Sequence, residues 1–121
     1  MPIEKVNLAE KFDSFKDHWH PRIVGRLNGQ EVKIVRLKGP FVMHKHDTED
    51  EMFLVISGLL KMKLEDKTLQ LKEGEFVIIP KGVLHCPIAD EEVKVMLFEP
   101  EGTVNTGNIE GDFTKKTIEE I

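Results

Sequence analysis

Short runs of β-forming residues, separated by turn residues, fill most of this chain. Residues 22–27 and 30–37 flank Asn28 and Gly29, a dipeptide that favours the positive φ values of a tight type I′ hairpin. Further runs of the same kind follow at close spacing, each bounded by glycine, proline or polar residues: 41–46, 52–57, 59–64, 68–71, 76–79, 83–88 and 93–98. About nine short strands in succession predict an all-β sandwich or barrel.

A short helix is predicted ahead of the strands, at residues 7–16. Asn7 can cap its first turn, and Leu8, Phe12 and Phe15 recur at the spacing that places them on one face. We therefore expect a one-sided helix that lies on the core.

The length of the chain, 121 residues, is enough for one domain. We expect a single domain over residues 1–121, with its core at about 22–100. Residues 101–121 would form a C-terminal loop and tail, and the pattern of 115–121 fits a frayed helix or a tail. No internal repeat or linker indicates a second domain.

Charge and hydropathy exclude two classes of partner. The formal net charge is −5 at pH 7, and lysine and arginine are scattered among acidic residues, so nucleic-acid binding is not expected. The longest apolar run, 52–56, is far shorter than the roughly 20 residues that cross a bilayer, so no membrane partner is expected. The N-terminus lacks the pattern of a secretory signal, and the single cysteine, Cys86, cannot form an intramolecular disulfide. These features predict a cytoplasmic protein.

Two of the runs are apolar at both their odd and even positions, so they do not alternate between apolar and polar residues. Residues 52–56 and 76–79 lack the polar alternation of a half-exposed strand, so both of their faces should be covered. One face would meet the core, and the other would meet the N-terminal helix or a second subunit. We therefore expect a homodimer.

Three histidines and one acid form a candidate metal site. His44 and His46 stand two residues apart in a β-type run, which places both imidazoles on one face and Lys45 on the other. Glu51 opens the next run, so an antiparallel return brings its carboxylate opposite the histidines, and His85 adds a third imidazole from a later run. This ligand set suits one divalent transition metal ion (iron, manganese, cobalt, nickel, copper or zinc) and suits calcium or magnesium poorly.

The same residues carry a resemblance to a known family. Residues 39–58, GPFVMHKHDTEDEMFLVISG, resemble the first motif of the cupin superfamily, G-x5-H-x-H-x3–4-E-x6-G, and residues 74–89, GEFVIIPKGVLHCPIA, resemble the second, G-x5-P-x-G-x2-H-x3-N. Two positions depart from the pattern: only four residues separate Gly39 from His44, and Ala89 replaces the final asparagine. More narrowly, the chain resembles small single-domain bacterial cupins of the mannose-6-phosphate isomerase-like group.

The resemblance implies a double-stranded β-helix, or jelly-roll, barrel with the short N-terminal helix outside it. It also implies that the metal ligands of the family correspond to four residues of this chain: His44, His46, Glu51 and His85. Similar ligand sets in the family serve dioxygenases, decarboxylases and isomerases.

If the ligands point inward, parity along the same runs predicts which side chains line the pocket beside them. These side chains are Val42, Phe53, Val55, Val83 and Pro87. The pocket would be mostly apolar and would admit a small organic molecule with one or two oxygen or nitrogen atoms able to bind the ion. No lysine or arginine is expected to point inward, so a sugar phosphate gains little support. No acid or base other than Glu51 is expected to point inward either.

Two further features have less specific interpretations. His18 and His20 form a second H-x-H pair, but Pro21 follows and no acid stands at the matching distance, so we interpret them as a solvated or interface pair. Cys86 neighbours His85, so in an extended strand its thiol points to the opposite face, and we interpret it as a small buried filler. A second metal site and a catalytic thiol are the respective alternatives.

The leading functional hypothesis is a metal-dependent enzyme that acts on a small organic substrate. The ion would polarise a substrate oxygen or, if it is iron, bring substrate and dioxygen together, and Glu51 would act as a ligand or as a catalytic base. One alternative is a non-catalytic small-molecule binder or sensor that uses the metal only to hold its ligand. Another is a structural zinc site, in which case the protein would unfold when a chelator removes the zinc.

Overall fold

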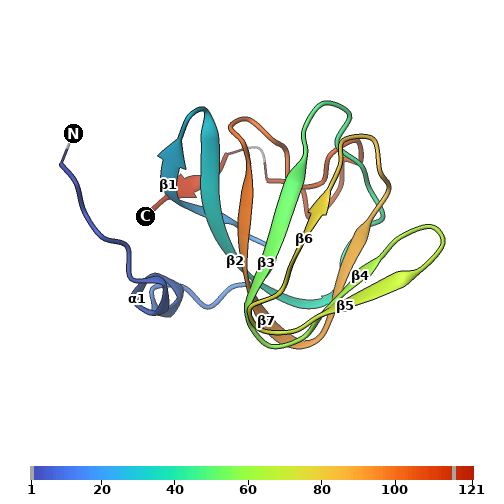
Figure 1. Ribbon diagram of the computed structural model, residues 1–121, viewed down its shortest axis with the longest axis horizontal. Helices are drawn as coiled ribbons and strands as arrows, with labels where there is room; N and C mark the ends of the chain where they lie inside the picture. Colours follow the sequence, from blue (N-terminus) through green and yellow to red (C-terminus); the bar gives the residue numbers. More distant parts are fainter. Residues whose placement is uncertain (1, 116) are drawn as a thin grey trace.

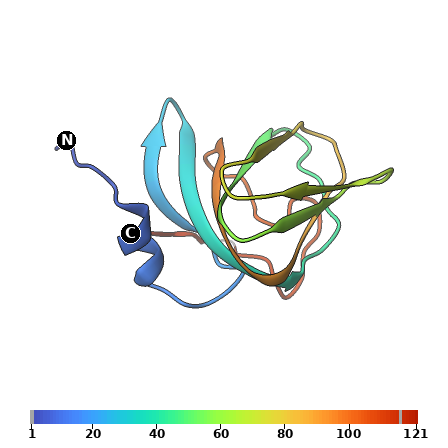
Figure 2. The same ribbon diagram turned by 60° about the horizontal axis from the view of Figure 1, so that its bottom comes forward.

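The computed structural model describes residues 2–115 and 117–121, and its regular structure is mainly antiparallel strands. The strands curl around one interior without closing the sheet completely (Figures 1 and 2). This open jelly-roll agrees with the predicted all-β fold. Its elements are α1 (Leu8–Asp13), β1 (Arg22–Leu27), β2 (Gln30–Pro40), β3 (Glu51–Ser57), β4 (Leu60–Lys63), β5 (Thr68–Leu71), β6 (Phe76–Ile79), β7 (Cys86–Pro100) and β8 (Glu119–Glu120).

The first hairpin forms as its sequence predicts. β1 pairs antiparallel with β2, and the turn residues Asn28 and Gly29 have φ values of 50° and 76°, the left-handed conformation that this turn needs. β2 then pairs with β7 over its whole length. Because β7 also pairs with β3 and β4, this one long strand joins the two sides of the barrel.

The two strands predicted at 83–88 and 93–98 are replaced by one continuous strand, β7, so that prediction is wrong. Ala89, which lies between the two predicted strands, is fully buried and lies opposite Gly39 in β2. The polar residues 90–92 are exposed and occupy a bulge, where the register between β2 and β7 shifts. A strand can bulge at such residues without ending, because neither glycine nor proline lies among them.

Residues 41–46 do not form the predicted strand. In place of a strand, the structure has an isolated antiparallel β-bridge between His44 and His85. The backbone N–H of Lys45 donates instead to the side chain of Asn108 in the C-terminal loop, at 2.9 Å. The segment is therefore held by loops, although the bridge still places the two histidines side by side.

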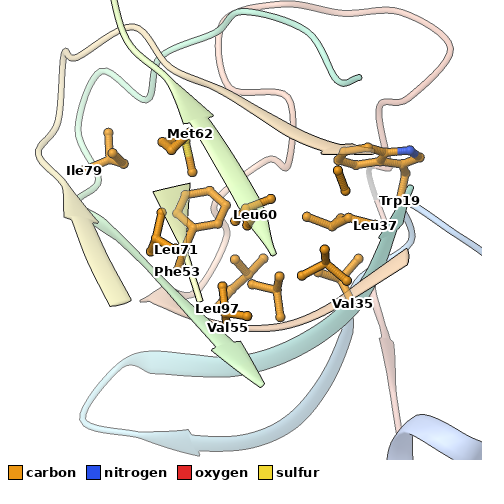
Figure 3. Close-up of a cluster of buried hydrophobic side chains, with 13 residues drawn as sticks. Trp19, Val35, Leu37, Phe53, Val55, Leu60, Met62, Leu71, Ile79 and Leu97 are labelled. Carbon is orange, nitrogen blue, oxygen red and sulfur yellow. The ribbon is translucent and has the colours of Figure 1, made fainter. Parts of the chain in front are cut away.

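The hydrophobic core fills the interior of the barrel (Figure 3). Val55, Leu60 and Met62 are completely buried, and Trp19 lies at one side of the cluster. The other buried members of this core come from the strands: Val35, Leu37, Phe53, Leu71, Ile79, Ala89, Val93, Val95 and Leu97.

The N-terminal helix is shorter than the predicted 7–16. Asn7 caps α1 by accepting a hydrogen bond from the N–H group three residues on, at 3.1 Å. Phe12 and Phe15 are buried against the outer face of the sheet. Arg36 of β2 donates to the Phe12 carbonyl at 2.9 Å and to the Phe15 carbonyl at 3.0 Å. Arg36 therefore joins the C-terminal end of the helix, and the segment that follows it, to the sheet.

Part of the outer face of the sheet stays open within one chain. Phe76 and Ile78 of β6 are 59% and 55% exposed, and the neighbouring Met52 and Leu54 of β3 are half-buried. The expectation that both faces of 76–79 are covered is therefore not met by the chain itself, because β6 lies at an edge where its described partner is β3.

The end of the chain returns to the sheet. β8 pairs in parallel with β1, so the last residues form neither a frayed helix nor a free tail. Lys116, which falls within that predicted segment, lies outside the described residues. In the part of the chain that the structure describes, no helix has the length and apolar character needed to cross a membrane.

Acid is expected to weaken the ion pairs that Glu92 makes beside α1. The hydrogen bond to His18 and the charge of Arg36 lower the pKa of Glu92 below its ordinary value. Because the folded-state pKa is lowered, this stabilisation is present above the ordinary pKa of about 4.3 and is lost as the pH falls through the lowered value. Glu92 is 38% exposed, so Glu92→Gln should reduce the free energy of unfolding at neutral pH by about 1 kcal/mol or less.

Urea unfolding at neutral pH and at about pH 3 measures this effect. Glu91→Gln is the matched control, because Glu91 is an exposed neighbour whose replacement removes the same charge. The loss caused by Glu92→Gln should shrink at acid pH. An equal loss at both pH values would contradict the assignment of this pH dependence to Glu92.

Candidate metal centre

The four predicted ligands lie together inside the barrel. Their donor atoms are all within 4.8 Å of one another, and each of the four residues is at most 3% exposed. His44 and His46 come from the segment between β2 and β3, Glu51 is the first residue of β3, and His85 immediately precedes β7. The structure therefore brings together four side chains that are separated by up to 41 residues, the difference between 44 and 85.

Two of the histidines are oriented by backbone carbonyls. Nδ1 of His44 lies 2.8 Å from the Val42 carbonyl, and Nδ1 of His85 lies 2.9 Å from the Val83 carbonyl. A carbonyl only accepts hydrogen bonds, so each Nδ1 carries the proton and each Nε2 keeps a free lone pair. Hydrogen bonds of this kind fix the tautomer and the ring orientation of metal-ligating histidines.

The free nitrogens face a carboxylate. Oε1 of Glu51 lies 3.2 Å from Nε2 of His46 and 3.3 Å from Nε2 of His85. When Nδ1 of His85 donates to its carbonyl, Nε2 has no proton for Glu51, so two acceptors face each other. Both ring nitrogens of His46 are buried without a hydrogen-bond partner among the described residues. A divalent cation between these atoms would satisfy them, so the donor set fits a metal ion.

The protonation states of the cluster also suit a metal. Burial and the neighbouring His85 lower the pKa of His44 to about 4, so its ring is neutral near pH 7. Burial raises the pKa of Glu51, but the neighbouring Glu99, His46 and His85 side chains outweigh burial and hold that pKa well below its ordinary value. Neutral imidazole and ionised carboxylate are the forms that bind metal ions.

A buried ion pair that the sequence analysis missed lies next to Glu51. Nζ of Lys33 is 2.8 Å from Oε1 of Glu99, and the two side chains are 2% and 1% exposed. Burial and the charge of Glu51 raise the pKa of Glu99 well above its ordinary value. The expectations that no lysine points inward and that Glu51 is the only inward acid are therefore wrong. Lys33 shares its parity with Val35, and Glu99 shares its parity with Leu97, which is the signal that could have placed them inside.

An apolar cavity of about 30 Å³ adjoins the cluster, with His44 and Glu51 in its wall. Trp19 and Phe41 also lie in the wall and stack on each other, with ring centroids 4.6 Å apart. The φ of Trp19 is 61°, an uncommon and strained value for a bulky residue. Sequence reasoning missed Trp19 because it precedes the strands that carry the motifs. The remaining lining includes Pro21, Val35, Leu37, Leu97 and Asn105.

The structure distributes the five predicted pocket residues over different places. Phe53 and Pro87 line the cavity. Val55 is completely buried in the hydrophobic core, and Val83 is 37% exposed in the turn before β7. Val42 contributes its carbonyl to the cluster. The side chains of Val42 and Val83 are absent from the described cavity wall because their segments are not regular strands, whereas Val55 lies on β3 and packs in the core instead.

The second histidine pair and the cysteine lie outside the cluster. Nε2 of His18 is 2.9 Å from Glu92, and Nδ1 of His20 is 3.3 Å from Asp17, so each of these histidines pairs with a separate acid near the surface. Cys86 is buried, and burial raises the pKa of its thiol. A buried thiol with a raised pKa has little thiolate to act as a nucleophile or ligand.

Comparison with known proteins identifies one family. The family model of the cupin domain matches residues 34–99, a segment that contains all four members of the cluster. Among solved structures, a cupin-2 domain containing protein from Shewanella frigidimarina is 42% identical with a TM-score of 0.79, over 79% of this chain and 94% of that one. The protein NMB1881 from Neisseria meningitidis is 27% identical with a TM-score of 0.74, over 81% of this chain and 100% of that one.

Curated relatives match over a shorter stretch. The uncharacterized protein YdbB of Bacillus subtilis is 33% identical over 63 residues, which are 51% of this chain and 56% of that protein. The chain spans about half the length of the curated relatives that it matches, 56% and 53% for two of them.

Proposed function

The chain belongs to the cupin domain family, and we propose that it binds one divalent transition metal ion through His44, His46, Glu51 and His85. The observation that carries this proposal is the group of acceptor atoms that face one another. Oε1 of Glu51 lies 3.2 Å and 3.3 Å from two imidazole nitrogens, inside a buried cluster. Imidazole nitrogens with one carboxylate oxygen suit iron, manganese, cobalt, nickel, copper or zinc.

The proposed role of the ion is catalysis on a small organic substrate. When bound, the ion would supply Lewis-acid chemistry or, if it is iron, redox chemistry. The apolar wall of the cavity would exclude water from the substrate. Glu51 would hold the ion or, if displaced from it, accept a proton at its carboxylate.

The cavity favours a small and largely apolar substrate. Its volume is about 30 Å³, so a larger molecule requires its wall to move. The indole N–H of Trp19 already donates to a backbone carbonyl at 2.9 Å. The amide of Asn105 donates to one backbone group and accepts from another, both at 2.8 Å. No lysine or arginine is among the described residues of the wall, which gives no support to a sugar phosphate.

A second candidate function is a non-catalytic binder or sensor in which the metal only holds the ligand. The observation in its favour is that Glu51 is the one acid among the described residues of the cavity wall, and it is also a proposed metal ligand. Among those residues, no separate acid or base is therefore in contact with the cavity. Turnover by the metal-loaded protein that is lost in Glu51→Gln would favour the enzyme, and tight binding without turnover would favour the binder.

The proposed assembly is a homodimer formed through the open face of the sheet. Its support is the exposure of Phe76 and Ile78 beside half-buried Met52 and Leu54, an apolar surface at an edge strand. Sedimentation velocity of the purified protein measures whether its mass in solution is that of two chains.

Elemental analysis of the protein purified without chelator or affinity tag tests the proposed metal site. We expect about one transition metal ion per chain, as for a mononuclear site. Protein that contains no metal and takes up none when divalent ions are offered would contradict the proposal. Cooperative unfolding on chelation would assign the ion a structural role instead of a catalytic one.

A further inference from the structure

The proposed metal centre is buried, so an ion needs a route into it. Each of the four proposed ligands is at most 3% exposed. The apolar cavity described above has His44 and Glu51 in its wall, and a second cavity, of about 210 Å³, has His46 in its wall. We call this second one the polar cavity, and its other wall residues are Asp47, Thr48, Glu49, Gly102, Val104, Gly107 and Asn108. The cluster therefore borders two cavities of different character.

The apolar cavity is a poor route for a hydrated cation. Its volume is about 30 Å³, and Glu51 is the one charged side chain among the described residues of its wall. A divalent ion arrives with bound water, and apolar side chains supply no oxygen or nitrogen atoms that could replace this water. Passage between such side chains therefore has a large free-energy cost.

The polar cavity offers negative charge and oxygen atoms instead. The side chain of Asp47 is 69% exposed and that of Glu49 is half-buried, so carboxylates stand both at the surface and further in. Nζ of Lys45 lies 3.8 Å from Asp47, but both side chains are exposed, and an ion pair of this kind is weak. The Thr48 hydroxyl donates to Glu49. A cleft lined by one sign of charge raises the local concentration of the opposite ion and speeds its association.

An unpartnered imidazole in the wall joins this cavity to the metal cluster. His46 is 3% exposed, and neither of its ring nitrogens has a hydrogen-bond partner among the described residues. The rings of His44 and His85 are each tied to a backbone carbonyl through Nδ1. The ring of His46 can therefore meet an ion in the polar cavity without breaking a hydrogen bond to a described residue.

We propose that the divalent ion enters through the polar cavity, where Asp47 and Glu49 attract the hydrated cation to His46. The inference rests on the proposed metal site, but it concerns how fast an ion reaches the cluster and not which atoms finally hold it. Entry from the side of His46 leaves the apolar cavity beside His44 to the substrate. Loss of the two carboxylates should therefore slow entry without changing the final coordination.

Stopped-flow mixing of the metal-free protein with cobalt(II) chloride measures the rate of entry through the absorbance of the bound ion. The double variant Asp47→Asn, Glu49→Gln removes both charges at nearly constant size, and its association rate constant should fall by about 10-fold at low ionic strength. Added salt should slow the original chain more than this variant, because salt screens the exposed carboxylates. The absorption spectrum of the cobalt-saturated protein should be the same for both, because neither residue is a ligand.

The chain supplies a control with the same change in net charge. Glu65 and Asp66 are exposed in the turn between β4 and β5 (Figure 1), and neither lies in the wall of the polar cavity. The double variant Glu65→Gln, Asp66→Asn should therefore bind cobalt at nearly the rate of the original chain. The comparison separates a local effect of the cavity from an effect of total charge.

A steric variant tests the same route in the metal-loaded protein. Val104 lies in the wall of the polar cavity and is 39% exposed, so Val104→Trp should narrow the cavity without entering the hydrophobic core. An ion leaves by the path through which it enters, so release of bound cobalt to excess chelator should slow several-fold, as should its entry, with unchanged affinity. Leu59→Trp is the control, because Leu59 is 41% exposed and lies in the wall of neither cavity.

Two results would overturn the inference. One is an equal association rate constant in the two double variants, whether unchanged or reduced. The other is release of cobalt from Val104→Trp as fast as from the original chain. If Val104→Trp does not fold, the comparison of the double variants decides alone. Both results leave the proposed metal site standing as long as the original chain binds cobalt, whereas an original chain that binds no cobalt contradicts the metal site itself.

Discussion

The double variant His44→Ala, His85→Ala is expected to lose the metal ion that the original chain binds. The two residues form the bridge that links the segment before β3 to the start of β7, and their ring centroids lie 4.3 Å apart. Without them only His46 and Glu51 remain of the buried cluster. Two ligands do not hold a transition metal against dilution, so bound metal should fall from about one ion per chain to a trace.

The chain supplies a matched control for this variant. His18 and His20 repeat the H-x-H spacing, but each pairs with its own acid away from the cluster. His18→Ala, His20→Ala removes the same number of imidazoles and should keep the metal. Elemental analysis and cobalt titration of both variants measure the difference, with circular dichroism to establish that each is folded. Retention of metal by the first variant, or equal loss in the second, would contradict the proposed ligand set.

The ligand cluster could be predicted because its geometry follows from short-range rules. The two-residue spacing of His44 and His46, and the return of the chain at Glu51, constrain these side chains within one turn and its neighbouring strand. The Asn28-Gly29 hairpin was predicted for the same reason, since the backbone angles of the turn depend on its own two residues. The third imidazole, that of His85, could be predicted because His85 lies at the histidine position of the second motif, residues 74–89.

The pocket could be predicted only in part, because parity was extended into segments that are not strands. Phe53 lies on the regular strand β3, where alternation holds, and it does line the cavity. Val42 and Val83 lie in loops, where the period of two has no meaning. Trp19 enters the cavity wall from a segment far from both motifs in sequence.

The ion pair beside Glu51 could not be predicted with local rules alone. Lys33 and Glu99 are 66 residues apart in sequence, and they meet because β2 and β7 pair in one particular register. Alternation along each strand points both side chains inward, but the rarity of buried charges argues against that interpretation for each residue taken separately. Because the two strands pair, the opposite charges lie side by side, and their attraction offsets the free-energy cost of removing both from water.

Replacing Gly107 by alanine is expected to disturb both the fold and the metal centre. Gly107 has a φ of 56°, and a Cβ atom at this position would lie 2.1 Å from the carbonyl oxygen of Lys45. That backbone is clamped in place, because the Lys45 carbonyl accepts from the N–H of Asn108 and the Lys45 N–H donates to the Asn108 side chain. Lys45 stands between His44 and His46, so a shift of its carbonyl should change the position of the two imidazoles relative to each other.

The expected effect of Gly107→Ala is the sum of two causes. The left-handed backbone costs an alanine about 1 kcal/mol or more, and displacement of a packed carbonyl adds about 1–3 kcal/mol. Gly102→Ala separates these causes, since Gly102 has a φ of 83° but no atom of the described residues lies within 4 Å of the point that its Cβ would occupy. Urea unfolding should show a clearly larger loss for Gly107→Ala, and only this variant should weaken cobalt binding. Equal losses of stability with unchanged cobalt affinity in both would show that the loop at Gly107 does not hold the histidine segment in place.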